Sequence, residues 1–563
     1  MGLDTDKHWI RDLAAICAAK GLTKIVLSPG SRCAPLVIAF NRHPQIDCYS
    51  IVDERCAAFF ALGMAQQLQQ PVGLVCTSGS AVLNFAPAIA EAYYQKVPLV
   101  VFTADRPNEL IDQQDGQTLR QYEIYRNYIK KSFELPSEVQ DNDTLWYSNR
   151  MVSEAINIAS YPDMGPVHVN VPLKEPLYGL MDYDGPAAPK IIKASPVQPQ
   201  LTDEAFAEVF EQWNGFASKM IVAGGTMPNE RLTKAIRTLS DRADTIIMAE
   251  ITANLHGEHF INCLDPALEA ISKDDKPNFR PELLITFGGA LVSKKLKTYL
   301  RTYPPKAHWH VDPGGAAVDT FKQLTRLIAM QPVHFFEALA ARLPLNNEGQ
   351  YQHDWLKIRA SSYDKHNQQL AVAPHSDLKV FEVLMKHLPA NSNLQLGNST
   401  PVRYASLFPP DPSKHITVNC NRGTSGIDGT VSTAAGAAFA TAILTTLITG
   451  DVAFFYDSNA LWNKQLPPHL KIIVVNNGGG NIFRIIQGPS QLEELEQFFE
   501  TGQGLTAKGI AQTYGLPYYH CSNYKELDNI LPDFFAPKPK AAILEINTPN
   551  TLSANMMRKY LNI

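Results

Sequence analysis

Four arginine residues follow predicted β-strands and could bind carboxylates. Each of them comes shortly after an apolar run: Arg32, Arg106, Arg403 and Arg422. A guanidinium group presents two parallel N–H donors that match the two oxygens of a carboxylate. Because ligands of parallel α/β sheets bind at the carboxyl ends of the strands, these positions predict a site for ligands with several carboxylates. For any single arginine, a surface ion pair is the alternative.

The first of these arginines lies in a predicted turn between a strand and a helix. The stretch TKIVLSPGSRCAPLVIAF begins as a buried strand, continues through a small polar turn with Ser31 and Arg32, and ends as the first turns of a helix. The start of a helix has unpaired N–H groups and a partial positive charge. With Arg32 beside it, the turn predicts an anion site. An ordinary turn with a solvated arginine is the alternative.

A carboxylate and two amides are also predicted to meet at a sheet edge. Asp451 ends one apolar run, and Asn476 and Asn477 end the next, one strand–helix–strand crossover later. The glycines at 478–480 let the backbone approach a ligand closely and leave a carbonyl free. One carboxylate with neutral oxygens suits Mg²⁺ when phosphates supply further ligands. A helix N-cap and an Asn-Gly turn are the alternative.

Glu54 is a third candidate for chemistry. It ends a predicted strand and opens an Ala-rich helix that we expect to be buried. A largely buried glutamate has a raised pKa and can share a proton with a ring nitrogen. The alternative is an acid that only interacts with the helix dipole.

The composition is that of an ordinary globular protein, with 45% hydrophobic and 19% charged residues. The net charge of −5 argues against a nucleic-acid surface. The eight cysteines form no CxxC pair and suit reduced thiols in a cytoplasm. The first residues lack the apolar core of a signal peptide. The uncharged run 432–449 predicts a buried helix leading into a buried strand, and no integral membrane segment is expected.

The elements that must position these residues alternate between strand-like and helical runs along almost the whole chain. This alternation predicts the α/β class, with three doubly wound, mainly parallel sheets. Proline-rich or weakly periodic stretches divide the chain. We expect domains at 1–182, 201–345 and 376–563, with linkers at 183–200 and 346–375.

These features together resemble the thiamin diphosphate enzymes. In that superfamily Gly-Asp is followed by Asn-Asn about one crossover later, as in GDVAFFYDSNALWNKQLPPHLKIIVVNN. The first region resembles their pyrimidine-binding domain, and the third resembles their diphosphate-binding domain, with a Rossmann-like middle domain between them. Within the superfamily, SPGSR, TADRP, GNS…VR and NRGTSGIDG are similar to the 2-succinyl-5-enolpyruvyl-6-hydroxy-3-cyclohexene-1-carboxylate synthases of menaquinone synthesis. The resemblance runs from Ser28 to the last strand.

The resemblance implies roles for the matching residues. Asp451, Asn477 and the carbonyl of Gly479 would bind Mg²⁺. Mn²⁺ is the alternative metal. The cofactor would also contact Glu54, Ser399, Ile427, Gly450 and Ile482, with Ile427 as the apolar wedge under it. The substrates would contact Ser31, Arg32, Arg106, Gln117, Lys294, Ser399, Arg403, Arg422 and Phe483. The residues implied to act in catalysis are Glu54, Arg32, Gln117, Arg403 and Arg422.

The implied reaction uses two small dicarboxylates. Thiamin diphosphate would decarboxylate 2-oxoglutarate, and the product carbanion equivalent would add to isochorismate in a conjugate fashion. Glu54 would exchange a proton with the aminopyrimidine ring, and Ser31 and Arg32 would hold a carboxylate of isochorismate or of its adduct. The resemblance also implies a cytoplasmic homodimer or homotetramer with active sites between subunits.

Three positions depart from the family pattern or leave a choice open. Val452 stands where the superfamily has glycine, and Gly116 stands where relatives often have a larger residue. The stretch SKKLK leaves Lys294 or Lys295 as the lysine of the substrate pocket.

Other functions remain as alternatives. An acetolactate synthase-like carboligase or a decarboxylase would lack this set of arginines. A nicotinamide dehydrogenase would need a G-x-G-x-x-G motif, which VAGGTMPNE and ITFGGALV do not supply. A non-catalytic nucleotide-binding protein could have the same fold.

Overall fold

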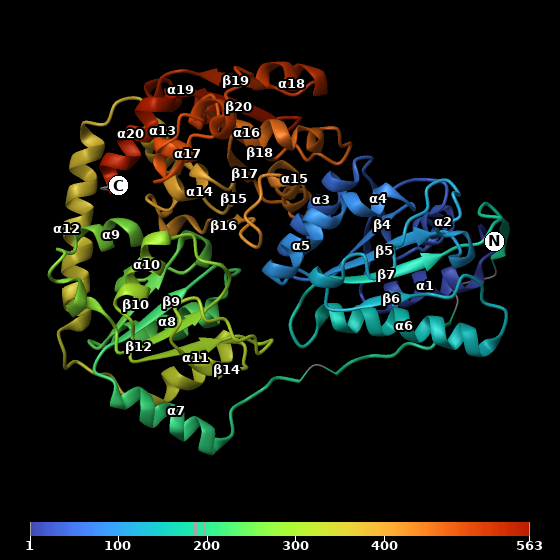
Figure 1. Ribbon diagram of the computed structural model, residues 1–563, viewed down its shortest axis with the longest axis horizontal. Helices are drawn as coiled ribbons and strands as arrows, with labels where there is room; N and C mark the ends of the chain where they lie inside the picture. The colour runs from blue at the N-terminus through green and yellow to red at the C-terminus, as the bar shows by residue number, and fades with distance from the viewer. Residues whose placement is uncertain (1, 184–187, 196, 562–563) are drawn as a thin grey trace.

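The computed structural model describes residues 2–183, 188–195 and 197–561, and it contains three parallel six-stranded sheets (Figure 1). The predicted fold class is confirmed. The strands are short runs of β-branched and other apolar residues, and most are buried along their whole length. Burial on both faces is expected for parallel sheets, which are covered by helices on each side.

The first sheet has the strand order β3-β2-β4-β5-β7-β6. Its strands are β2 (Lys24–Ser28), β3 (Asp47–Ser50), β4 (Val72–Cys76), β5 (Leu99–Asp105), β6 (Ser132–Glu134) and β7 (Val167–Pro172). One face packs against α1 (His8–Ala19), α2 (Ala34–Arg42) and α6 (Asn142–Ser160). The other face packs against α3 (Glu54–Leu68), α4 (Ser80–Asn84) and α5 (Ala86–Gln95). Ile25 and Leu27 lie in the first of these cores and Val26 in the second, as the period of a strand requires.

A small antiparallel pair joins the two ends of this domain. Strand β1 (Gly2–Thr5) pairs with β8 (Leu180–Tyr183). The stretch MGLDTDKHWIRDLAAICAAKGL has the pattern of an amphipathic helix with charges throughout. The helix α1 begins only at His8, because the residues before it extend to pair with β8.

The middle sheet has the order β11-β10-β9-β12-β13-β14. Its strands are β9 (Lys219–Ala223), β10 (Thr245–Ala249), β11 (Phe260–Ile261), β12 (Leu283–Phe287), β13 (Ala307–Val311) and β14 (Leu324–Ile328). Helices α7 (Asp203–Gly215), α8 (Glu230–Ser240) and α11 (Pro332–Arg342) cover one face. Helices α9 (Leu264–Ala270) and α10 (Lys294–Thr302) cover the other face together with Trp355.

Trp355 belongs to a long helix that lies within a predicted linker. Helix α12 (Tyr351–Ala371) fills most of 346–375 and runs along the side of the molecule between the middle and third domains (Figure 1). By contrast, residues 188–195 of the other predicted linker form no helix or strand.

The third sheet has the order β16-β15-β17-β18-β20-β19. Its strands are β15 (Asn393–Leu396), β16 (Thr417–Cys420), β17 (Thr445–Gly450), β18 (Leu470–Asn476), β19 (Tyr518–Cys521) and β20 (Ala542–Asn547). One face packs against α13 (Asp377–His387), α14 (Thr400–Ala405), α17 (Ile482–Ile485), α19 (Tyr524–Phe535) and α20 (Asn550–Leu561). The other face packs against α15 (Thr430–Ala440), α16 (Asp451–Tyr456) and α18 (Ala507–Tyr514).

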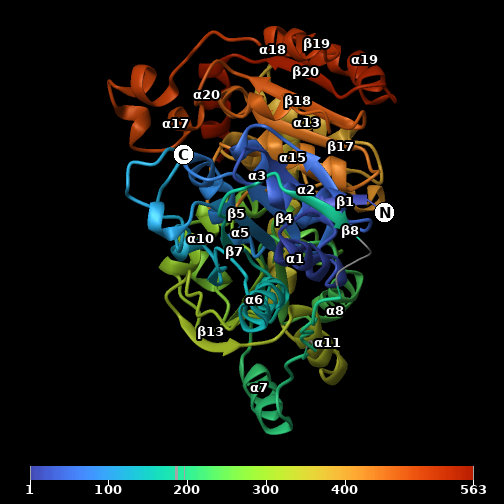
Figure 2. The same cartoon turned by 90° about the vertical axis from the view of Figure 1, so that its right-hand side faces the viewer.

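The first and third domains share one apolar core, in which α3 crosses α15 (Figure 1; Figure 2). The backbones approach closely at two glycines. A Cβ on Gly63 would lie 2.1 Å from the carbonyl oxygen of Thr433, and a Cβ on Gly436 would lie 1.9 Å from that of Phe60. The uncharged run 432–449 thus forms a buried helix and a buried strand, as predicted. No helix in the described part of the chain is long and apolar enough to cross a membrane.

Candidate functional site

Asp451 and Asn477 lie side by side at the carboxyl edge of the third sheet. Strands β17 and β18 are neighbours, with Gly450 paired to Val475, so the residues that follow each strand meet. Asp451 is the first residue of α16 and is 6% exposed. Burial raises the pKa of its carboxyl to about 7, although backbone N–H groups, including that of Gly478, oppose this rise. A buried carboxylate of this kind needs a cation or a proton.

Asn477 presents an unpaired oxygen beside that carboxylate. Its Nδ2 donates to Oδ2 of Asp377 at 2.9 Å, which fixes the orientation of the amide. Its Oδ1 is buried and has no hydrogen-bond partner among the described residues. Asp377 is itself held by Thr548 and Ser553. The amide therefore has one oxygen left for a ligand.

The backbone after Asn477 forms a turn that excludes side chains. Gly479 has φ 152°, and a Cβ there would lie 2.6 Å from the carbonyl oxygen of Glu500. A carboxylate, a free amide oxygen and a carbonyl in a side-chain-free turn suit Mg²⁺ bound with a diphosphate. Within the described ranges no group of three or more His, Cys, Asp and Glu residues could hold a metal by itself.

The side chain of Asn476 makes structural hydrogen bonds with both its nitrogen and its oxygen, unlike that of Asn477. Its Nδ2 donates to Oε1 of Glu545 at 2.7 Å and to the carbonyl of Leu505 at 2.9 Å. Its Oδ1 accepts from the N–H of Gly478 at 3.1 Å. Asn476 therefore holds the turn, and only Asn477 has an oxygen available. No local sequence signal marks Asp377 or Glu545, because both residues reach Asn476 and Asn477 from distant elements.

Glu54 is the first residue of α3, and Asp53 is its N-cap. In the single chain Glu54 is half-buried rather than largely buried, and its Oε2 accepts from Nδ2 of Asn84 at 3.2 Å. The helix that Glu54 opens is buried, as expected, whereas Glu54 itself is only partly covered in one chain. The helix is buried along α15, but its first turn lies at the border of that contact, where Arg55 donates to the carbonyl of Tyr456.

Arg32 and Arg106 converge at the carboxyl edge of the first sheet, as predicted. Arg32 is buried and donates to the carbonyl of Leu173 at 2.9 Å and to Glu175 at 3.0 Å. Arg106 lies 3.8 Å from the same Glu175 carboxylate and 3.4 Å from Asp115. Its Nε is buried without a partner among the residues that the structure describes. In this structure the carboxylate between the two arginines is thus the exposed Glu175.

Two further predicted residues border this edge. Ser31 is exposed in the turn before Arg32. Gln117 has φ 58°, and a Cβ on Gly79 would lie 3.3 Å from its Cα, so the loop is packed against the end of β4. Gly116 leaves open space, since a Cβ there would meet nothing within 4 Å.

Arg403 and Arg422 form a pair of like charges at the edge of the third sheet. Burial and then the charge of Arg422 lower the pKa of Arg403. Arg403 donates to the carbonyl of Ser399, and Arg422 donates to Oδ1 of Asn398 at 3.1 Å. The Nε of Arg422 is buried and has no partner in the described part of the chain. Two neighbouring guanidinium groups with a spare donor suit an anionic ligand.

The lysines of α10 differ in what they contact. Lys295 binds Glu269 and the carbonyl of Leu561, and is therefore engaged in structural contacts. Lys294 is exposed and makes no hydrogen bond or ion pair within the described ranges. Lys297, which the sequence did not indicate, is near Arg403 and Arg422; burial lowers its pKa, and Glu250 opposes this effect.

The remaining predicted residues lie in loops of the third domain or in the short helix α17. Ser399 has φ 73° at the start of α14, and Phe483 in α17 contacts the ring of Phe499 at 5.5 Å. Ile427 and Ile482 are half-buried. Ile482 and Phe483 place apolar groups directly after the polar turn that follows β18.

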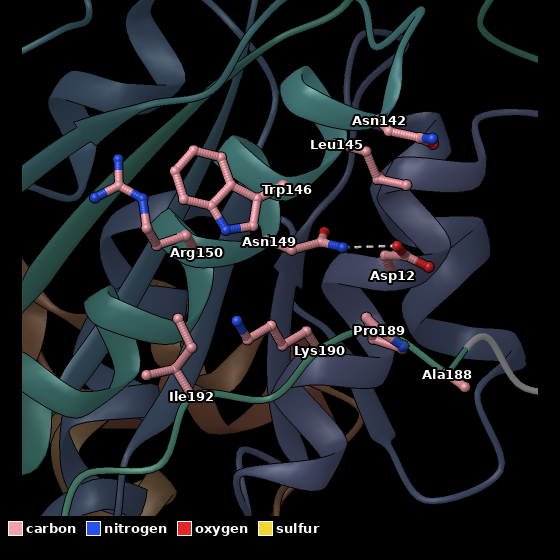
Figure 3. A pocket seen from close by; sticks show the side chains of 10 residues that line it. All are labelled: Asp12, Asn142, Leu145, Trp146, Asn149, Arg150, Ala188, Pro189, Lys190 and Ile192. Atoms are coloured by element: carbon pink, nitrogen blue, oxygen red, sulfur yellow. Dashed lines mark hydrogen bonds between the residues drawn. The ribbon is translucent and has the colours of Figure 1, made fainter.

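A cavity of about 420 Å³ lies elsewhere, between α1 and α6 (Figure 3). Asn149 donates there to Asp12, and Trp146, Arg150 and Lys190 lie around it. None of the predicted site residues lines it. The candidate site is instead divided between the exposed edges of the first and third sheets.

Comparison with protein families supports this reading. Residues 9–124 match the N-terminal thiamin diphosphate-binding domain of thiamine pyrophosphate enzymes, and residues 193–396 match the middle domain of such enzymes. Together with these matches, the three parallel sheets and the sheet edge that carries Asp451 and Asn477 define a thiamin diphosphate-dependent enzyme.

Full-length relatives narrow the assignment. A 2-succinyl-5-enolpyruvyl-6-hydroxy-3-cyclohexene-1-carboxylate synthase of Flavobacterium psychrophilum is 44% identical over 98% of each chain. A protein of the same name from Christiangramia forsetii is 41% identical over 98% of each chain. Another from Porphyromonas gingivalis is 41% identical over 99% of this chain and 97% of the relative. The chain belongs to the family of 2-succinyl-5-enolpyruvyl-6-hydroxy-3-cyclohexene-1-carboxylate synthases.

Proposed function

We propose that the protein catalyses the decarboxylation of 2-oxoglutarate and the conjugate addition of the resulting succinyl carbanion equivalent to isochorismate, with release of CO₂, in menaquinone synthesis. The observation that carries the proposal is the free Oδ1 of Asn477 beside buried Asp451. The arginine pair at the same sheet edge supports a substrate with carboxylates.

The residues fit thiamin diphosphate and Mg²⁺. Asp451, Asn477 and the Gly479 carbonyl would hold the metal, and Mn²⁺ could replace it. Ser399, Ile427, Gly450 and Ile482 would contact the cofactor. When bound, the cofactor supplies the electron sink that makes decarboxylation of a 2-oxoacid feasible.

The chain's own residues would bind and orient the substrates. Arg403 and Arg422 would bind carboxylates from the third domain, with Phe483 against the apolar part of the substrate. Arg32 and Arg106 would bind carboxylates from the first domain once the Glu175 side chain has moved away from them. Ser31 and Gln117 would assist this binding. Lys294 would add a positive charge from the middle domain, and Glu54 would hold or move a proton at the aminopyrimidine ring.

We further propose that each site is shared between two subunits of a cytoplasmic homodimer or homotetramer. In one chain Arg55, next to Glu54, contacts Tyr456 at the C-terminal end of α16, whereas Asp451 begins that helix. Half-buried Glu54 would become covered by a partner's third domain. In this assignment 1–182 binds the pyrimidine ring, 376–563 binds the diphosphate and 201–345 lies between them.

A turnover assay tests the reaction. The purified protein is expected to convert 2-oxoglutarate and isochorismate only with thiamin diphosphate and Mg²⁺ present, and an Asp451→Ala variant should lose cofactor affinity. A protein that prefers pyruvate to 2-oxoglutarate would instead be an acetolactate synthase-like carboligase.

Complementation tests the sharing of sites. Inactive Glu54→Gln and Asp451→Ala subunits are mixed and allowed to exchange. Random pairing should restore up to about a quarter of the wild-type activity, because each mixed dimer has one intact site. If exchange is confirmed by mass and no activity returns, each site is built within one chain.

A further inference from the structure

Glu91 is a buried carboxylate of the first domain that binds a loop of the third domain. It lies in α5 and is 1% exposed. Its Oε1 accepts from the N–H of Gly423 at 2.7 Å, and its Oε2 accepts from the N–H and the hydroxyl of Thr424, both at 2.6 Å. Gln95 of the same helix donates to it as well. Both carboxylate oxygens are therefore engaged by fixed donors.

The same loop is held from its other side by the third domain itself. Asn398 donates from Nδ2 to the carbonyls of Asn421 and Gly426, at 2.6 and 2.7 Å. Its Oδ1 accepts from Arg422. Glu91 and Asn398 thus fix a loop that carries Arg422 near its start and Ile427 near its end.

The contact leaves no room for a larger residue in the loop. A Cβ on Gly423 would lie 2.7 Å from the backbone carbonyl oxygen of Glu91 and 3.0 Å from its Oε1. The N–H groups of two successive residues can approach one carboxylate only because this position has no side chain. The glycine after Arg422 in NRGTSGIDG is therefore explained by α5 of the first domain.

We infer that Glu91 is a positioning residue, which acts through the 421–427 loop on the site built on its own chain's third domain. The inference rests on the proposed function, which places Arg422 at the substrate and Ile427 at the cofactor. Glu54 belongs to the same first domain, yet in the shared arrangement it serves the other site. One first domain would then serve both sites of a dimer: its Glu54 supplies the proton relay of one, and its Glu91 fixes the substrate-binding loop of the other.

The first test uses Glu91→Gln, which keeps the size of the side chain. One of its two oxygens becomes an N–H₂ donor that faces another donor in the loop. We expect the amides of 421–429 to lose hydrogen-exchange protection, and kcat/KM to fall about tenfold or more through KM. Lys96→Gln is the matched control, since Lys96 follows the same helix but contacts Asp312 of the middle domain.

The outcomes separate positioning from simple stabilisation. Faster exchange confined to the loop, with a normal melting temperature and a raised KM, supports the inference. Unchanged loop exchange, or uniformly faster exchange together with a lower melting temperature, overturns it. Because exchange is measured without substrate, this result stands even if the enzyme proves to use other substrates.

The second test asks which site Glu91 serves. Mixed dimers are isolated with two different tags, one subunit being wild type and the other carrying Glu54→Gln, alone or with Glu91→Gln. In both kinds of mixed dimer, only one site remains active. That site combines Glu54 of the wild-type subunit with the third domain of the variant subunit. We expect the double variant alone to show the raised KM in that surviving site. A wild-type KM there would overturn the inference, because Glu91 would then act on the same site as the Glu54 of its own domain.

Discussion

The metal affinity of the site should depend on pH through Asp451. Burial raises the pKa of this carboxyl from 3.8 to about 7. A divalent cation binds the ionised form, so below about pH 7 a proton must leave when the metal enters. The apparent affinity for Mg²⁺ should then fall by a factor that approaches tenfold per pH unit below the pKa, or about fiftyfold between pH 7 and pH 5.

The same shift has a second consequence for the metal-free protein. Because the pKa is higher in the folded than in the unfolded state, the folded state binds more protons between about pH 4 and about pH 7. The free energy of unfolding should therefore decrease as the pH rises through this range, and Mg²⁺ should restore stability most strongly above it.

The assay is a Mg²⁺ titration at saturating thiamin diphosphate, followed by protein fluorescence at several pH values. Asp451→Asn is the control, because an amide does not titrate while the cofactor's diphosphate titrates equally in both proteins. The difference in slope between the two proteins isolates Asp451. Equal slopes would refute the reasoning that burial keeps this carboxyl protonated in the empty site.

Four other substitutions have defined outcomes. Glu54→Gln should lower kcat about 10²–10⁴-fold with an unchanged circular dichroism spectrum, because an amide cannot move the proton; near-normal turnover would contradict the role. Gly436→Ala should lower the free energy of unfolding by about 1–3 kcal/mol in denaturant titrations, because its Cβ would meet the carbonyl of Phe60. An unchanged midpoint of the denaturation curve would show that α3 and α15 can move apart without a loss of stability. Lys294→Ala should reduce kcat/KM about ten- to 150-fold, whereas Lys295→Ala should chiefly lower thermal stability by freeing Glu269; the reverse pattern would exchange their roles.

The sequence predicted the strand ends well because the chemistry there is local. SPGSR, Asp451 and Asn477 each come directly after an apolar strand, and within each parallel sheet the residues that follow the strands lie at one edge. Two of the short edge strands, β14 and β19, were not predicted. Strand β14 alternates half-buried and exposed residues, and β19 is mostly half-exposed, so neither has a continuous apolar run.

Residues that act through distant contacts could not be found from sequence. Asp377 is 100 positions from Asn477, and Glu91 is 332 positions from Gly423. Neither lies in a motif, and on a helix each could equally be a surface acid. Glu54 is half-buried although α3 is a buried helix, because it is the first residue of that helix and lies at the border of the contact with α15.

The pairing of β1 with β8 determines how the first domain is connected to the rest of the chain. The segments that enter and leave this domain lie side by side, with Gly2 opposite Tyr183 and Thr5 opposite Leu180. A domain closed in this way is suited to circular permutation, since its ends can be joined by a short linker and the chain opened at an exposed loop. It should also unfold as one cooperative unit, because separating the two strands disconnects the first element from the last.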